Sequence, residues 1–174
     1  MEVSASDRVK APNRQELQQR WLPPSPEIIK INCDASFDSI TGNVGACAIA
    51  RDCSGAIIAG DTSSFKALSA SAAEAFALRV GVCLAIVAGF HEVQLESDNA
   101  GVISRIVSKS FSSWDSTSIE EDIVSLALPF PNFSFSYVSR SCNMAVDWVA
   151  RNARVDLCPH DWFSVVPSGL MTLL

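Results

Sequence analysis

Residues 71–88 are the feature that most limits how this chain can fold. The segment places Ala, Phe, Leu, Val, Cys and Ile around much of a helical surface, so a helix there must be largely buried. Gly89 follows as a natural stop, because glycine readily takes the left-handed conformation that ends many helices. The rest of the chain must therefore supply the elements that cover this helix.

Five segments around this helix have the composition of β-strands. Residues 28–37 alternate in polarity and are rich in β-branched side chains, and residues 44–51 and 56–65 follow closely enough to form an antiparallel meander. Two further strands are predicted after the helix, at 92–97 and 133–137. All five are short enough to belong to one sheet.

Three more helices are predicted between and after these strands. The first covers 99–109, and the second begins with a capping box of Ser118 and Glu121 and ends before Pro129. The last runs from an Asn143 cap to about Arg154. The order βββαβααβα predicts an α/β fold in which helices cover a mixed five-stranded sheet.

The composition indicates one globular domain. The chain has 174 residues, is 48% hydrophobic and carries a formal net charge of −6. We expect a flexible leader over 1–26, ending in a proline-rich linker, and a domain over 27–155. Residues 156–174 form an apolar tail that is a candidate to pack on the domain.

Composition also limits the cellular compartment of the protein and the way in which it could bind nucleic acid. No apolar run is judged long enough to span a membrane, and the N-terminus has no signal-peptide pattern. The six cysteines lack the spacing of a metal site, so we expect reduced thiols in an intracellular protein, either nuclear or cytoplasmic. We also expect a monomer. The acidic balance argues against nucleic-acid binding by bulk charge but leaves room for a local basic stripe and bridging metal ions.

Four carboxylates occupy positions where acids are costly unless they are compensated. Asp34 ends the first strand, Glu74 opens the long helix, Asp98 ends the fourth strand and Asp147 lies in the last helix. Strand parity puts Asp34 and Asp98 on the more polar faces of their strands. If these strands are parallel neighbours, the two carboxylates meet at one sheet edge, where a hard cation such as Mg²⁺ would compensate them.

Each acid also has a purely structural explanation. Asp34 could open a loop, and Glu74 completes a capping box with Ser71. Asp98 could cap the helix that follows it, and Asp147 could pair with Arg151 one turn later. These explanations are compatible with a metal site, because one side chain can serve both purposes.

The chain resembles type 1 ribonuclease H, and more narrowly the plant ribonuclease H-like domains related to retroelement reverse transcriptases. The resemblance covers about residues 21–170 and rests on five short segments in order. They are INCDAS at 31–36, GACAIARDCSG at 45–55, AEAFAL at 73–78, LESD at 95–98 and YVSRSCNMAVDWVA at 137–150.

This resemblance implies a nuclease that cuts the RNA strand of an RNA/DNA hybrid with two Mg²⁺ ions, about 3.5–4 Å apart, for which Mn²⁺ can substitute. It implies that Asp34 bridges both ions, that Asp147 holds the ion on the water side, and that Glu74 and Asp98 hold the ion on the leaving-group side. The residues predicted to contact the hybrid are Ala35, Ser36, Arg140 and Asn143. Further candidate phosphate contacts, each more simply read as a solvated cation, are Lys66, Arg105 and Lys109.

The sequence departs from the family pattern near these acids. Ala35 replaces the usual glycine, Tyr137 stands where the plant group has histidine, and no histidine lies between Tyr137 and Asp147. Val146 and Trp148 flank Asp147 where small residues are common. A second hypothesis is therefore a weak or inactive domesticated module that binds nucleic acid or protein. A third, exonuclease or integrase chemistry on the same fold, ranks last because integrase-type sites carry their glutamate on a late helix.

Overall fold

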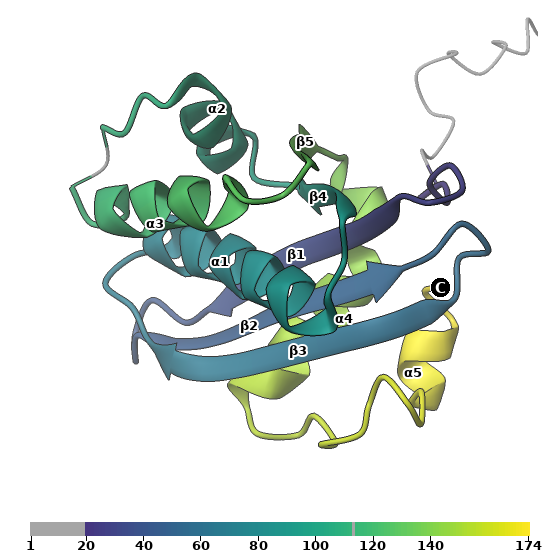
Figure 1. Ribbon diagram of the computed structural model, residues 1–174. Helices are drawn as coiled ribbons and strands as arrows, with labels where there is room; N and C mark the ends of the chain where they lie inside the picture. The colour runs from purple at the N-terminus through teal and green to yellow at the C-terminus, as the bar shows by residue number, and fades with distance from the viewer. Residues whose placement is uncertain (1–19, 113) are drawn as a thin grey trace, which may run out of the picture.

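The computed structural model describes residues 20–112 and 114–174, and these form a five-stranded sheet in the order β3-β2-β1-β4-β5 (Figure 1). The strands are β1 (Ile29–Phe37), β2 (Asn43–Arg51), β3 (Ile57–Lys66), β4 (Glu92–Ser97) and β5 (Asn132–Tyr137). β1 to β3 pair as an antiparallel meander, whereas β4 pairs in parallel with both β1 and β5. The predicted α/β fold and its order of elements are confirmed.

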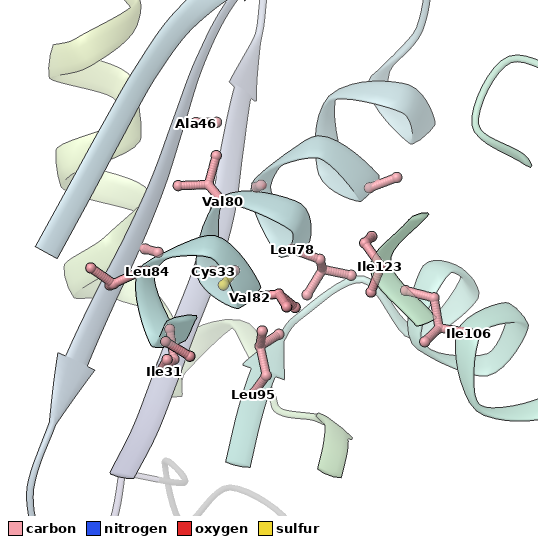
Figure 2. Close-up of a cluster of buried hydrophobic side chains, with 14 of the residues drawn as sticks. Ile31, Cys33, Ala46, Leu78, Val80, Val82, Leu84, Leu95, Ile106 and Ile123 are labelled. Atoms are coloured by element: carbon pink, nitrogen blue, oxygen red, sulfur yellow. The ribbon is translucent and has the colours of Figure 1, made fainter. Parts of the chain in front are cut away.

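Helix α1 (Ala70–Ala88) is the central helix of the fold. Figure 2 shows its Leu78 and Val82 side chains among Ile31 and Leu95 of the sheet. By length and hydropathy α1 could cross a membrane, so the expectation that no apolar run is long enough is wrong. Within the fold, 56% of that apolar window is buried, as in the core helix of a globular domain.

The N-terminus of α1 differs from the prediction. Ser69 is the N-cap, and its side chain accepts a hydrogen bond from the backbone N–H of Ala72. Ser71 lies inside the helix, so the predicted capping box of Ser71 and Glu74 is wrong. The carboxylate of Glu74 is therefore not used to cap its own helix.

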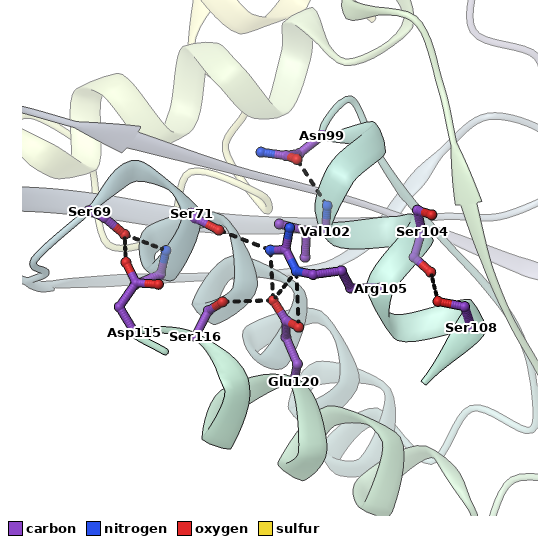
Figure 3. A network of polar contacts seen from close by, with 11 residues as sticks. Ser69, Ser71, Asn99, Val102, Ser104, Arg105, Ser108, Asp115, Ser116 and Glu120 are labelled. Carbon is purple, nitrogen blue, oxygen red and sulfur yellow. Dashed lines mark hydrogen bonds and ion pairs between the residues drawn. The ribbon is translucent and has the colours of Figure 1, made fainter. Parts of the chain in front are cut away.

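Two shorter helices, α2 (Ala100–Ser108) and α3 (Thr117–Ala127), lie on the same side of the sheet as α1. The predicted capping box of Ser118 and Glu121 is wrong, because α3 begins two residues earlier than predicted, with Ser116 at the N-cap. The Ser116 hydroxyl instead donates to Glu120, which is fully buried and binds Arg105 of α2 at 2.7 Å (Figure 3). Arg105 also donates to Ser71, so this ion pair connects α2 and α3 to the first turn of α1.

The other face of the sheet is covered by α4 (Met144–Arg154), which follows the short 3₁₀ helix η1 (Arg140–Cys142). Gly45 of β2 permits the close approach, because a Cβ there would lie 2.2 Å from the Ala150 carbonyl oxygen. The apolar tail packs on this side through the buried Trp162 and through Leu170 of α5 (Ser168–Met171). Helix α4 is thus enclosed by the sheet and the tail.

Part of the predicted flexible leader contacts the fold. Residues 1–19 lie outside the described part of the chain, but Trp21 and the buried Pro24 pack against the domain. The Trp21 ring lies 3.5 Å from the Arg51 guanidinium, and the backbone oxygen of Leu22 accepts a hydrogen bond from Lys30. The contacts of the domain therefore begin before residue 27.

Candidate functional site

Strands β1 and β4 bring Asp34 and Asp98 to the same edge of the sheet. The two strands are parallel neighbours, with Ile31 opposite Leu95 and Asn32 opposite Glu96. The parity argument is therefore confirmed, because Asp34 lies two residues beyond Asn32 and Asp98 two beyond Glu96. Asp98 is not the cap of α2, whose N-cap is Asn99 with its side chain bonded to the Val102 N–H.

Glu74, from the second turn of α1, completes a group of three acids. One ligand oxygen from each of Asp34, Glu74 and Asp98 lies within 4.8 Å of the others. Asp34 is only 5% exposed, and Glu74 is half-buried. Glu74 Oε2 is buried and has no hydrogen-bond partner among residues 20–112 and 114–174. Three clustered carboxylates, one of which has this buried oxygen without a partner, fit a hard divalent cation.

The electrostatics of the group point the same way. Burial, followed by repulsion from Glu74 and Asp98, raises the pKa of Asp34 far above its usual range. Burial and the charge of Asp98 raise the pKa of Glu74 to about 8. Burial also raises the pKa of Asp98, opposed chiefly by the positive charge of Arg140. The fold thus holds these carboxylates where their negative charge is poorly compensated, as sites for cations do.

Asp147 lines the same cleft, of about 370 Å³, but it is not a member of the three-acid group. Its Oδ1 accepts a 3.0 Å hydrogen bond from Arg151 Nε, so the predicted pair within α4 is confirmed. The neighbouring Val146 is fully buried, and Trp148 lies against Gly169 of α5. These bulky neighbours therefore anchor α4 on both sides of Asp147.

The residues predicted to contact a hybrid occupy different places. Ala35 and Arg140 line the cleft, and Ser36 is half-buried on β1 beyond Asp34. Asn143 is 1% exposed, and its side-chain amide donates to the Cys33 carbonyl oxygen at 3.0 Å. Asn143 thus lies beneath the cleft.

The other predicted phosphate contacts are less uniform. Arg105 is neither a free phosphate ligand nor a solvated cation, because two of its nitrogens bind the buried Glu120. Lys66 and Lys109 are exposed. Lys66 Nζ donates to the backbone oxygen of Thr41, and Lys109 ends α2 in the left-handed conformation.

One group of polar residues was missed by the sequence analysis. Asn32, Arg51 and Glu96 are buried on the face of the sheet that carries Asp34, and they hydrogen-bond to one another or to Trp21. One signal in the sequence was Arg51, because a cation at the end of an apolar strand needs a polar partner if it is buried. Strand pairing was needed to bring these residues together.

The comparisons with known proteins agree with this architecture. A family described as reverse transcriptase-like matches residues 32–153, whereas no curated protein sequence matches the chain. The ribonuclease H1 of the halophilic archaeon Halobacterium salinarum has a similar structure, with a TM-score of 0.69 and 20% identity over 74% of this chain and 98% of its own.

Two further solved structures are similar. The N-terminal RNase H domain of a Mycobacterium tuberculosis protein gives a TM-score of 0.69 at 19% identity, covering 75% of this chain and 95% of that one. A ribonuclease H1 isolated from compost, in complex with an RNA/DNA hybrid, gives 0.65 at 16% identity, covering 74% and 97%. At these identities the structures show the fold, and the family match covers most of the domain. The chain therefore belongs to the reverse transcriptase-like family, as a domain of the ribonuclease H type.

Proposed function

We propose that this protein is a Mg²⁺-dependent endonuclease that hydrolyses the RNA strand of RNA/DNA hybrids. The observation that carries the proposal is the group of Asp34, Glu74 and Asp98, whose ligand oxygens lie within 4.8 Å of one another. In the described part of the chain, the buried Glu74 Oε2 also has no hydrogen-bond partner. A protein that used these acids only for stability would be expected to pair them with donors. A cation site explains why Glu74 Oε2 is buried without a donor among the described residues.

Each acid has a distinct place in this proposal. One Asp34 oxygen lies within 4.8 Å of oxygens from both Glu74 and Asp98, so Asp34 would help to hold both ions. Glu74 and Asp98 would hold the ion on the leaving-group side. Asp147, across the cleft, would complete the water-side position. Two Mg²⁺ ions, when bound, would activate the attacking water and stabilise the leaving 3′ oxygen.

Arg140, another residue of the cleft, would help to bind the phosphate groups of the substrate. Arg140 is exposed at the rim, and its positive charge reaches both Glu74 and Asp98. A phosphate that enters the cleft would meet this guanidinium before the acids, which would offset part of the repulsion. Choice of RNA over DNA would depend on contacts to the 2′-hydroxyl. The compost ribonuclease H1 solved with an RNA/DNA hybrid supports the proposed substrate.

One observation favours a second function, a binding module with little or no activity. Asp147 is paired with Arg151 and lies outside the three-acid group, so the water-side position is incomplete in this arrangement. Ala35 also adds a Cβ at the cleft where the family has glycine. Such a module would bind a hybrid without cutting it.

The two functions separate in a cleavage assay with a labelled RNA/DNA hybrid and Mg²⁺. The endonuclease cuts the RNA strand, and Asp34→Asn does not. A protein that binds the hybrid but leaves it intact under these conditions would be the binding module.

A further inference from the structure

Trp21 closes a buried polar network that leads to the acidic site, although it precedes the family match at residues 32–153. Its ring lies 3.5 Å from the Arg51 guanidinium, and its Nε1 donates to Glu96 Oε2 at 3.2 Å. Arg51 is 1% exposed and Glu96 is 2% exposed. The indole therefore shields two charged groups from water and satisfies one of them.

The network continues from Glu96 through Asn32 toward the cleft. The amide nitrogen of Asn32 donates both to Glu96 Oε2 at 2.9 Å and to Asn143 Oδ1 at 3.3 Å, while its oxygen accepts from Arg51 at 2.7 Å. Lys30 also binds Glu96, at 3.0 Å. Glu96 thus has three donors, and the one nearest the cleft is shared with Asn143.

Asn143 connects this network to the acids. Its Nδ2 donates to the carbonyl oxygen of Cys33, next to Asp34, and its backbone oxygen accepts the N–H of Asp147 at 3.1 Å. Its side chain also hydrogen-bonds to Asp98. Asn143 therefore hydrogen-bonds to the side chain of Asp98, to the backbone of Asp147 and to the residue before Asp34.

Removing the Trp21 N–H would take away one of the three donors of a buried carboxylate. The hydrogen bond from Asn32 to Glu96 would then strengthen at the expense of the bond from Asn32 to Asn143. The bond to Asn143 is already the longer of the two, at 3.3 Å against 2.9 Å. Loss of the ring would also open Arg51 to water, and a cation over an aromatic face contributes about 0.5–2 kcal/mol. Both changes would loosen Asn143 rather than the sheet, because the strand pairing of β1 and β4 does not involve Trp21.

We propose that Trp21 is a positioning residue for the acidic site, which holds Asn143, and through it Asp98 and the start of α4, in the geometry that binds the metal. The inference rests on the proposed function, because it takes the acids to be metal ligands. It also makes the segment that contains Trp21 a working part of the domain.

The test compares three variants of the full chain. Trp21→Ala removes both the ring and the N–H, and Trp21→Phe keeps a ring over Arg51 but loses the N–H. Leu22→Ala is the matched control, because Leu22 is 69% exposed and its hydrogen bond to Lys30 uses the backbone oxygen, which the substitution keeps. Mn²⁺ affinity is measured by titration calorimetry without nucleic acid, and kcat and KM are measured on a hybrid.

Direct partners of metal ligands typically change metal affinity by about 10–100-fold. Trp21 acts on the direct partner Asn143 through three further hydrogen bonds, so we expect its effect at the low end of that scale. Relative to the unmodified protein, we expect Trp21→Ala to bind Mn²⁺ about tenfold more weakly and Trp21→Phe about threefold more weakly. The kcat should fall with metal affinity while KM for the hybrid stays nearly constant, because the substrate surface is unchanged. Leu22→Ala should match the unmodified protein.

Equal Mn²⁺ affinity in Trp21→Ala and Leu22→Ala would overturn the inference while leaving the proposed function in place. If Trp21→Ala does not fold, as judged by thermal unfolding, Trp21→Phe decides in the same way. If the unmodified protein binds no Mn²⁺, the proposed function fails and this inference fails with it.

Discussion

Arg151 donates a 3.0 Å hydrogen bond from Nε to Oδ1 of Asp147, one helical turn earlier in α4. The acid that the resemblance assigns to the water side is therefore neutralised by a cation of the protein itself. Arg151 is 58% exposed and Asp147 26% exposed, and pairs of this kind contribute about 0–1 kcal/mol. The pair is weak enough for a divalent ion to replace Arg151.

This relationship predicts that Arg151 competes with metal. Replacing it by glutamine should lower the Mg²⁺ concentration that half-saturates binding, by up to about fivefold, which corresponds to about 1 kcal/mol. Arg151→Lys keeps the charge and should change the midpoint less. A midpoint that is unchanged or higher in Arg151→Gln, measured by calorimetry, would contradict the competition.

The buried acids predict an unusual dependence of stability on pH. The folded-state pKa of Asp34 is raised from 3.8 and that of Glu74 from 4.5 to about 8. Between about pH 4 and pH 8 the folded protein holds protons that the unfolded chain has released, so the free energy of unfolding should fall as pH rises. The limit is about 1.4 kcal/mol per pH unit for each group.

Thermal unfolding between pH 5 and pH 8 in a chelator would measure this effect. Mg²⁺ should raise the melting temperature, and more so at pH 8 than at pH 5, because bound metal replaces the protons. Asp34→Asn should flatten the dependence in the chelator. A protein whose stability rises steadily over this range without metal would not have acids in the environment described.

The ion pair of Glu120 and Arg105 predicts a large stability effect at a distance from the cleft. Glu120→Ala would leave Arg105, whose side chain is 21% exposed, without its carboxylate, and breaking a buried pair typically costs about 3–5 kcal/mol. Asp122→Ala is the matched control in the same helix, because its pair with Arg79 is exposed and should contribute at most about 1 kcal/mol. Urea denaturation would separate the two, and similar midpoints would contradict a structural role for Glu120.

Gly45 predicts how closely α4 must approach the sheet. In Gly45→Ala the new Cβ would lie 2.2 Å from the Ala150 oxygen and 2.3 Å from the Arg154 nitrogen, both backbone atoms of α4. We expect loss of stability and of metal binding together, because α4 carries Asp147. Gly101→Ala is the control, since its Cβ would meet side-chain atoms no nearer than 3.4 Å and alanine favours the helix. Equal melting temperatures for the two variants would contradict this packing.

Much of the fold could be predicted from the sequence, because hydrophobic periodicity sets the elements and their order. Strand parity placed Asp34 and Asp98 on the more polar faces of their strands, but the parallel pairing of β1 and β4 that brings them together was only a condition of that prediction. Helix starts were less predictable, since Ser69 and Ser116 compete with nearby serines for the cap positions. Only the packed structure shows which serine is used.

The four acids that line the cleft could be selected from the sequence, but their contacts could not. Arg105 looked like a surface cation until Glu120, from a different helix, was placed beside it. Arg51, Asn32 and Glu96 lie on three different strands, so no local pattern could connect them to Trp21. Long-range polar networks of this kind depend on strand order and register, which cannot be deduced directly from a single sequence.

The central claim is that Asp34, Glu74 and Asp98 hold divalent metal for cleavage of an RNA/DNA hybrid. The most direct test incubates the full chain and Asp34→Asn with a hybrid labelled on its RNA strand, with Mg²⁺ or with a chelator. We expect the unmodified protein to cleave the RNA strand in Mg²⁺ but not in the chelator, and we expect no cleavage by Asp34→Asn. An intact RNA strand after incubation with the unmodified protein, or equal cleavage by both proteins, would contradict it.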